Sequence, residues 1–357
     1  MRQRLVPTLR SVGDTGRSVL QPHLETRNHP VDPASSLDAA LAGITDMNSQ
    51  SRRTMITAGA LGAAALALPL KAQAAASSVT APTQFVDVGG RRLAYRSVGT
   101  GKPLVLCNRF RGVLDLWDPA FIDGLAAQGF QVVTFDYSGL GQSTGEKSYN
   151  PMSLAKDGKD LIEALGLKDV AIGGWSIGGI AAQILLAMTG PMASHVVLLA
   201  TTPPGPLVKT GEQLFYDTAA IPGIALEQFT TVFFEPADAG SRAASKRSFD
   251  RIMARKQDRS PDVPADWAMA QIGNTPRNPM FPSDQILQLL KTTSVPILHL
   301  GADHDIVFPI ENWYALNRQL PTLHLITYAR AGHGPHHQYP DEASAQIGAF
   351  VKATSKG

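Results

Sequence analysis

Apolar residues follow two patterns along most of the chain: short continuous runs, and the spacing of one face of a helix. Short runs such as 103–107, 130–135 and 195–201 are almost wholly apolar and have the length of strands buried on both faces. The stretch 153–166 instead places its apolar residues on one face of a helix. Strands of this kind in alternation with helices predict a fold of the α/β class, with a mostly parallel sheet covered by helices on both faces.

The alternation begins near residue 80 and is interrupted once. At its start, residues 83–99 predict a hairpin that turns at Gly89-Gly90. Between about 204 and 283 no strand pattern occurs, only helical stretches separated by prolines. We interpret residues 204–283 as a helical lid inserted into a core that comprises 80–203 and 284–357.

The first 75 residues do not follow this pattern and are excluded from the predicted fold. Residues 1–46 are polar, rich in Arg, Pro and Ser, and lack clear periodicity. They predict either a disordered leader or a start of the protein at Met47 instead of Met1.

Residues 47–75 have the layout of a cleavable export signal. Arg52 and Arg53 precede an Ala- and Leu-rich run at 58–70, and small residues follow that run. The run is shorter than the roughly 20 residues needed to span a bilayer, although an anchoring or buried helix is the alternative interpretation. We therefore expect a periplasmic or secreted protein, or a membrane-tethered one if the signal is not cleaved.

Composition narrows the classes of function. The 357 residues are 44% hydrophobic and 17% charged, as in ordinary globular proteins, and their formal net charge is +2. So small a charge argues against nucleic acid as the main partner. The histidines lack the spacing of metal ligands, so we expect neither a metal nor a cofactor. The lone Cys107 excludes an intrachain disulfide, and its apolar neighbours predict a buried structural thiol.

Ser176 lies in the stretch GGWSIGG, between a predicted strand and a predicted helix. The pattern G-x-S-x-G in that context is typical of a sharp turn that exposes a nucleophilic serine. Flanking glycines remove the Cβ atoms that would clash there, and the amide of Ile177 at the helix start can face an oxyanion. An incidental serine in a glycine-rich turn is the alternative, which suitably placed partners would disfavour.

Such a serine needs a general base and an acid that orients the base. The loop after the strand at 323–329 supplies His333, with His336 and His337 as second choices that more naturally line the mouth of the site or face solvent. The loop after the strand at 295–301 supplies Asp305 and Asp303. We favour Asp305 as the orienting acid and expect Asp303 to cap the turn.

The chain from about 83 to 351 resembles the α/β-hydrolase superfamily, whose members use no cofactor for this chemistry. The stretches that carry the resemblance are GWSIGG, GADHDIVFP, AGHG and DYSGLGQSTG, the last with Ser138 where the family commonly has arginine. The resemblance implies catalysis by Ser176, Asp305 and His333. The arginine pair of the export segment likewise resembles a twin-arginine signal, which implies the twin-arginine export machinery as a partner in transit.

One loop departs from the family pattern. Asn108-Arg109 stand where His-Gly is common, so Phe110 is expected to supply the second oxyanion amide beside that of Ile177. Arginine adopts positive φ less readily than glycine. Either the loop differs in shape, or Arg109 reaches towards the substrate, or Arg109 and Arg111 pair with acids on the surface.

The predicted lid carries two further features. Its large apolar side chains are candidates for a substrate pocket or for the core of the lid; Phe229 and Phe233, together with Trp175 beside the serine, are the candidate substrate contacts. A helix near 241–255 is basic, and we expect a solvated face there more than an anion site. The apolar residues in question are Leu226, Phe229, Phe233, Phe234, Trp267 and Met269, and the basic ones are Arg242, Lys246, Arg247, Arg251 and Arg255.

These features predict a serine hydrolase that cleaves a carboxylic ester or lactone of a small apolar substrate through an acyl-enzyme. A serine nucleophile excludes the alkyl-enzyme chemistry of relatives that have aspartate at this turn. An acyltransferase, a perhydrolase of the haloperoxidase type and a carbon–carbon bond hydrolase would use the same three residues. A non-catalytic binding protein that retains the pocket is the remaining alternative.

Overall fold

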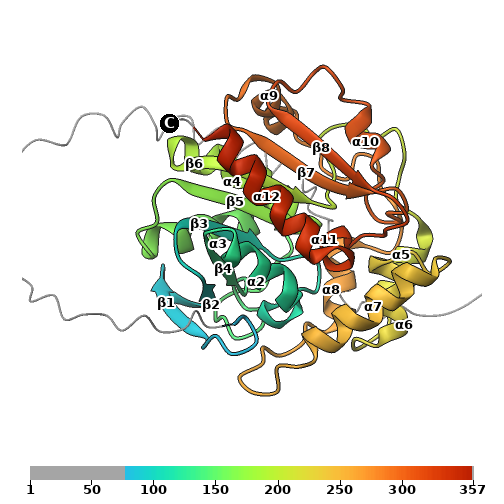
Figure 1. Cartoon of the computed structure of the whole chain (residues 1–357), viewed down its shortest axis with the longest axis horizontal. Coiled ribbons are helices and arrows are strands. Elements are labelled where there is room, and N and C mark those ends of the chain that lie inside the picture. The colour runs from blue at the N-terminus through green and yellow to red at the C-terminus, as the bar shows by residue number, and fades with distance from the viewer. Residues whose placement is uncertain (1–76, 356–357) are drawn as a thin grey trace, which may run out of the picture. The chain divides into compact units, whose positions relative to one another are not determined.

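The computed structural model describes residues 77–355, so the predicted leader and export signal lie outside the described part of the chain. Its centre is an eight-stranded sheet in the order β1-β2-β4-β3-β5-β6-β7-β8 (Figure 1). The β1–β2 and β2–β4 pairs are antiparallel and all others are parallel, which confirms the predicted mostly parallel sheet. The strands are β1 Gln84–Val88, β2 Arg91–Val98, β3 Lys102–Cys107, β4 Phe130–Phe135, β5 Val170–Trp175, β6 Ala193–Leu199, β7 Ile297–Ala302 and β8 Leu323–Tyr328.

Helices cover both faces of the sheet, and strand β3 shows how. Leu104 and Leu106 point into a core shared with α2 (Pro119–Ala127) and α12 (Pro340–Thr354), which lie side by side in Figure 1. Val105 and Cys107 point into a second core on the opposite face. This second core is shared with α3 Pro151–Ala164, α4 Ile177–Thr189 and α9 Asp284–Thr292; shorter helices are η1 Leu114–Leu116, η2 Gly190–Met192, α10 Glu311–Tyr314 and α11 Pro335–Gln338.

The Cys107 thiol is fully buried in that second core, as expected for a structural cysteine. Burial raises its pKa to about 12, because a thiolate would have no solvation there. Within residues 77–355, no helix has the length and apolar character that crossing a membrane requires.

The segment between β6 and α9, residues 204–283, contains helices and no strand among its described residues. We call it the helical insertion; it is coloured from green-yellow to orange in Figure 1 and lies beyond one end of the strands. The carboxyl end of α6 meets the loop after β8, where Gly334 N donates to Phe233 O at 2.9 Å. The four helices are α5 Gln213–Ala219, α6 Leu226–Phe233, α7 Ala239–Ile252 and α8 Ala265–Ile272.

The basic helix α7 is not only a solvated face. Its exposed face carries Arg242, Lys246 and Arg247, as expected. Arg251, in contrast, forms two hydrogen bonds with Asp118, the residue that caps the amino end of α2. Arg255 is 8% exposed. The prediction was therefore wrong for these two arginines, because their partners come from parts of the chain that helix periodicity does not reveal.

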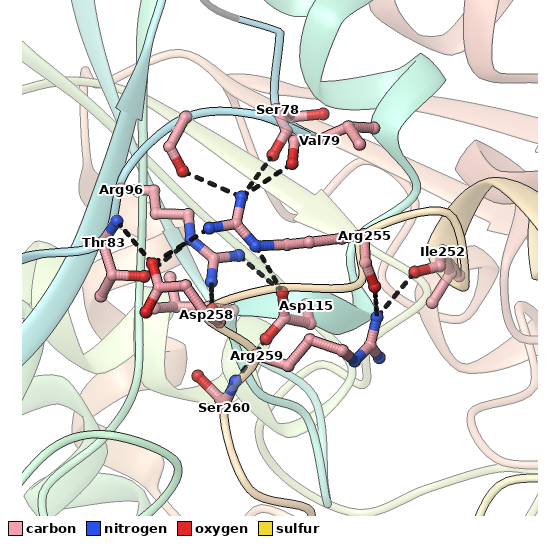
Figure 2. Close-up of polar contacts among 12 residues, drawn as sticks. Ser78, Val79, Thr83, Arg96, Asp115, Ile252, Arg255, Asp258, Arg259 and Ser260 are labelled. Atoms are coloured by element: carbon pink, nitrogen blue, oxygen red, sulfur yellow. Dashed lines mark hydrogen bonds and ion pairs between the residues drawn. The ribbon is translucent and has the colours of Figure 1, made fainter.

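Arg255 belongs to a buried ionic cluster that joins the insertion to the core (Figure 2). Asp115 Oδ1 lies 2.7 Å from Arg96 Nη1 and 3.4 Å from Arg255 Nε. Asp115 Oδ2 accepts from the amide of Ser260 at 2.6 Å. Arg255 Nη1 also donates to the carbonyl oxygen of Ala81, at 2.9 Å. One carboxylate thus connects strand β2, the loop after β3 and the end of α7.

Candidate active site

Ser176 follows β5 directly and precedes the first residue of α4. Its backbone has φ 60° and ψ −125°, a strained conformation for a residue with a side chain. Neighbouring strands hold it there: Ser176 N donates to Leu199 O at 3.0 Å, and Thr201 Oγ1 donates to Ser176 O at 2.7 Å. Strain that is fixed in this way is typical of a functional position.

Close backbone approaches explain the two glycines of the motif. A Cβ on Gly174 would lie 2.0 Å from Gly178 O, and one on Gly178 would lie 2.2 Å from Cys107 O. Any larger residue would force the strand, the turn or the loop after β3 apart. The glycines therefore bring the start of α4 against the loop that carries Arg109 and Phe110.

His333 and Asp305 meet at the same edge of the sheet, on the loops after β8 and β7. His333 Nδ1 lies 2.9 Å from both carboxylate oxygens of Asp305. Asp305 is fixed in turn by the amides of Val307 and Phe308, which donate to its Oδ1 at 2.8 and 2.9 Å. His333 Nε2 is buried and forms no hydrogen bond with any residue from 77 to 355. The acid thus orients the ring and leaves Nε2 free to accept a proton.

The competing candidates lie elsewhere. Asp303 pairs with His304, whose Nδ1 is 2.6 Å from Asp303 Oδ1, and has no contact of this kind with His333. His336 and His337, expected at the mouth of the site or in solvent, are both 0% exposed. They pack against Trp175, at 4.6 Å between ring centroids in each case. Burial lowers the pKa of both imidazoles well below its usual value, so both are neutral.

The backbone amides of Ile177 and Phe110, which are the predicted oxyanion donors, are free to bind a ligand. Ile177 N and Phe110 N donate to no acceptor among residues 77–355. Asn108 fixes the Phe110 loop, because its side chain donates to Phe135 O at 2.6 Å and accepts from the indole N–H of Trp117. Sequence reasoning gave Asn108 no role, since nothing in its spacing marks a loop anchor.

Arg109 and Arg111 do not pair with surface acids. Arg109 is 7% exposed, and its guanidinium lies over the rings of Trp175 and Phe233, 5.1 and 4.5 Å from their centroids. Burial lowers its pKa to about 9. Arg111, not Arg109, takes the positive φ of this loop, 54°. The guanidinium of Arg111 binds backbone carbonyls at and after the end of α5, including Ala219 O at 2.8 Å.

A pocket lies in front of Ser176 and His333. It contains about 580 Å³ of space between atoms, the part open to solvent included. Most of its wall comes from α5, α6 and the loop between them, and Phe229 and Phe233 line it as predicted. Leu226, Phe234, Trp267 and Met269 do not line it. Sequence reasoning missed Ile224, Gln228 and Val232, although their spacing around Phe229 would place them on one face of a helix.

Trp175 does not line this pocket, contrary to its prediction as a substrate contact. It is 1% exposed and points away from the opening, between Trp117, His336 and His337. Residues next to each other in a strand face opposite sides, so the side chain of Ser176 faces the pocket whereas that of Trp175 faces the opposite side.

In the described residues, no group of three or more His, Cys, Asp or Glu side chains is arranged to hold a metal ion.

Comparisons with known proteins agree with this fold. A family model described as "alpha/beta hydrolase fold" matches residues 102–340. BpoC of Mycobacterium tuberculosis, which carries the name of a non-heme bromoperoxidase, is 26% identical over 245 residues, 68% of this chain and 90% of its own. An α/β-hydrolase fold protein from Chitinophaga pinensis has a TM-score of 0.67 and 28% identity, with 78% of this chain and 100% of that one covered. The esterase RhEst1 from Rhodococcus, at 21% identity and a TM-score of 0.60 over 76% of this chain and 99% of its own, shares the fold.

Proposed function

Since the chain belongs to the α/β-hydrolase fold family, we propose that it is a serine hydrolase that cleaves a carboxylic ester or lactone. One observation carries the proposal. Ser176, held at φ 60°, opens into the same pocket as the free Nε2 side of His333, while Asp305 holds the other side of that ring. A strained serine, an oriented base and a bound acid are the parts that acyl transfer needs.

The proposed reaction proceeds in two halves. Ser176 Oγ attacks the carbonyl carbon while His333 Nε2 takes its proton, and the oxyanion accepts hydrogen bonds from the amides of Ile177 and Phe110. The imidazolium then protonates the departing alkoxide, which leaves an acyl-enzyme on Ser176. A water molecule repeats the attack with His333 again as base, and the carboxylic acid leaves. Asp305 stabilises the imidazolium in both halves.

The apolar wall of the pocket suits the hydrocarbon part of such a substrate. Ile224, Phe229 and Phe233 come from the helical insertion and face the serine across the pocket. We propose that the insertion acts as the lid of the site, since it forms most of the wall. Hydrolysis of p-nitrophenyl esters of increasing acyl length measures the fit directly.

Labelling of the serine tests the proposal. A fluorophosphonate probe should modify Ser176, and Ser176→Ala should abolish both labelling and ester turnover while its circular dichroism spectrum stays that of the wild type. Ser143, a buried serine outside the site, provides the matched control: Ser143→Ala should keep the labelling. Labelling of a residue other than Ser176, or turnover by Ser176→Ala, contradicts the proposal.

The likeness to BpoC motivates a second candidate on the same residues. In perhydrolysis, hydrogen peroxide replaces water as the attacking group on the acyl-enzyme, and the product is a peracid, which can oxidise bromide. Bromination of monochlorodimedone in the presence of acetate, hydrogen peroxide and bromide measures this activity. Its dependence on acetate and on Ser176 separates it from direct oxidation by peroxide.

A further inference from the structure

We propose that Arg109 is a specificity-determining residue that binds an anionic group of the substrate, a carboxylate or another small oxyanion. The inference rests on the proposed function, because it concerns the same pocket. It refines the prediction of an apolar substrate, which rested on the large apolar residues of the lid, and it develops the alternative in which Arg109 reaches towards the substrate. The substrate class that fits is an ester or lactone with an apolar segment and a negatively charged end.

The charges of the pocket wall are of one sign. Arg109 and Arg111 both line it, and no aspartate or glutamate does so among the residues described. The carboxylate of Asp305 interacts with Nδ1 of His333 and with the amide of Val307, and it does not line the pocket. Asp262 influences both guanidiniums through its charge but forms no ion pair with either. The pocket in front of the serine is therefore positively charged.

Arg111 has a structural explanation, so it does not carry the inference. Its Nη1 donates to the carbonyl oxygens of Ala219 and Ile221 at 2.8 and 3.0 Å, and its Nη2 donates to that of Gly223 at 3.2 Å. These carbonyls lie at and just after the carboxyl end of α5 and carry partial negative charge. Arg111 thus attaches the loop after α5 to the core.

Arg109 has no such partner set. Its only hydrogen bond within residues 77–355 joins Nη1 to Phe110 O, at 2.7 Å. Its Nε is buried without a partner, and its Nη2 donates to no group. A buried charge that lacks an opposite charge is strongly unfavourable unless something else compensates it. The faces of Trp175 and Phe233 offset part of this cost but satisfy no N–H donor.

The arrangement has the chemistry of an anion site. The planar guanidinium packs against two adjacent aromatic rings, Trp175 and Phe233, whose centroids are 5.0 Å apart, and this contact restricts the direction of its free N–H groups before a ligand arrives. It lies one residue from Phe110, whose amide is the proposed oxyanion donor, and beside the pocket that Ser176 and His333 line. A carboxylate bound to Arg109 would therefore hold the ester of the same molecule close to the serine.

Two pairs of substrates test the inference. Mono-p-nitrophenyl adipate has its charge on the acyl side, and 4-acetoxybenzoate has its charge on the leaving-group side. Each is compared with the neutral primary amide of the same shape. The wild-type protein should prefer at least one charged member, and Arg109→Gln should raise KM for that member about 10- to 100-fold while it leaves the neutral partner nearly unchanged. Arg109→Lys should restore part of the preference.

The controls separate this inference from its alternatives. Arg92→Gln removes a surface arginine that lies over Phe85 and should leave the preference intact. Equal losses on charged and neutral substrates in Arg109→Gln would assign Arg109 to positioning of the loop and overturn the inference. So would a wild-type protein that turns over the neutral members as well as the charged ones, even if Arg109→Gln fails to fold.

Binding without turnover separates the inference from the proposed function. Calorimetry on Ser176→Ala should show binding of adipate or benzoate but not of adipamide or benzamide, and the additional change Arg109→Gln should remove it. If this binding occurs while no ester is cleaved by the wild type, the hydrolase proposal fails and the anion site stands. If esters are cleaved and no anion binds, the reverse holds.

Discussion

The indole N–H of Trp175 donates to the backbone carbonyl of His333 at 2.7 Å, so the residue before the serine is bonded to the residue that carries the imidazole. This bond joins the end of β5 to the loop after β8. We expect Trp175→Phe, which keeps a ring but removes the donor, to lower kcat about tenfold with little change in KM, because the carbonyl loses its partner and the loop shifts. Trp267→Phe, outside the pocket, should leave kcat unchanged. An unaltered kcat in Trp175→Phe would show that the bond does not position His333.

The acid of the site can be distinguished from its neighbour by matched substitutions. Asp305→Asn should lower kcat roughly 10⁴-fold, because the amide no longer holds the imidazole in the required tautomer. Asp303→Asn should retain activity and change the free energy of unfolding by about 0.5 kcal/mol, since its partner His304 is half exposed. Steady-state kinetics on one p-nitrophenyl ester measures both. A reversed order of the two effects would assign Asp303 as the orienting acid.

Local patterns were sufficient to predict the fold and to nominate Ser176, Asp305 and His333. Each of these lies on the turn or loop after a predicted strand, and the carboxyl ends of parallel strands meet at one edge of the sheet. The geometry now brings the three loops together, while their catalytic roles stay a proposal.

Tertiary contacts explain the polar side chains whose burial the sequence patterns did not predict. Arg251 and Arg255 looked solvated because helix periodicity says nothing of Asp118 and Asp115, more than a hundred residues earlier. His336 was expected at the mouth of the site or in solvent because imidazole is polar. It packs instead against the rings of Phe121 and Trp175. Burial of polar side chains depends on partners that are distant in sequence.

Asp115 should be the most sensitive residue of the buried ionic cluster in Figure 2. Asp115→Asn removes the buried carboxylate that Arg96 and Arg255 share, and among residues 77–355 the only acid that then pairs with Arg255 is the exposed Asp258, at 3.1 Å. We expect the free energy of unfolding to fall by about 3 kcal/mol. The exposed pair of Lys246 and Asp250 gives the control: Asp250→Asn should cost less than about 1 kcal/mol. Urea denaturation measures both, and equal costs would contradict the assignment.

Buried histidines that stay neutral in the folded protein predict that its stability falls as the pH falls. Burial lowers the pKa of His195 to about 4 and that of His299 to about 3, and it lowers the pKa of His336 and His337 well below the usual value. The unfolded chain takes up protons at these groups near pH 6.5, whereas the folded chain does not. The stability that their neutrality provides is therefore present above pH 6.5 and lost as the pH falls, by up to about 1.4 kcal/mol per pH unit for each histidine.

Two groups, Asp136 and His304, act in the opposite direction, and a variant isolates the contribution of one buried histidine. The hydrogen bond with Asp303 raises the pKa of His304, so its contribution is present below pH 6.5 and is lost as the pH rises. Burial raises the pKa of Asp136 to about 6, so its contribution is greatest below pH 4 and is lost as the pH rises through 6. The four buried histidines outweigh these two groups, and urea midpoints should fall between pH 7.5 and pH 5.5. His336→Gln should flatten this slope by about one proton, whereas the exposed His324→Gln should not. Equal slopes in all three proteins would contradict the interpretation.

We propose that the segment 47–75 directs export of the protein. The first described residues are already part of the fold, because Ser77 Oγ and Ser78 N donate to the carboxylate of Asp123 at 2.8 and 2.7 Å. Cleavage close to Ala75, after Ala72-Gln73-Ala74, would leave these contacts intact. N-terminal sequencing of the secreted protein should therefore begin near Ala75. A start beyond Ser78 would contradict this site, because the amino end would have lost its attachment to α2.

The arginine pair determines the proposed route. Arg52 and Arg53 stand before a weakly apolar run, which suits a pathway that exports proteins already folded. A protein that has folded before export gains nothing from disulfides formed outside, and the single Cys107 agrees with that. Replacement of both arginines by lysine should retain the precursor in the cytoplasm, where Ser176 should still react with a fluorophosphonate probe. Unaltered export would exclude the twin-arginine route, and a secreted or membrane fraction that retains residues 58–70 would identify them as an anchor.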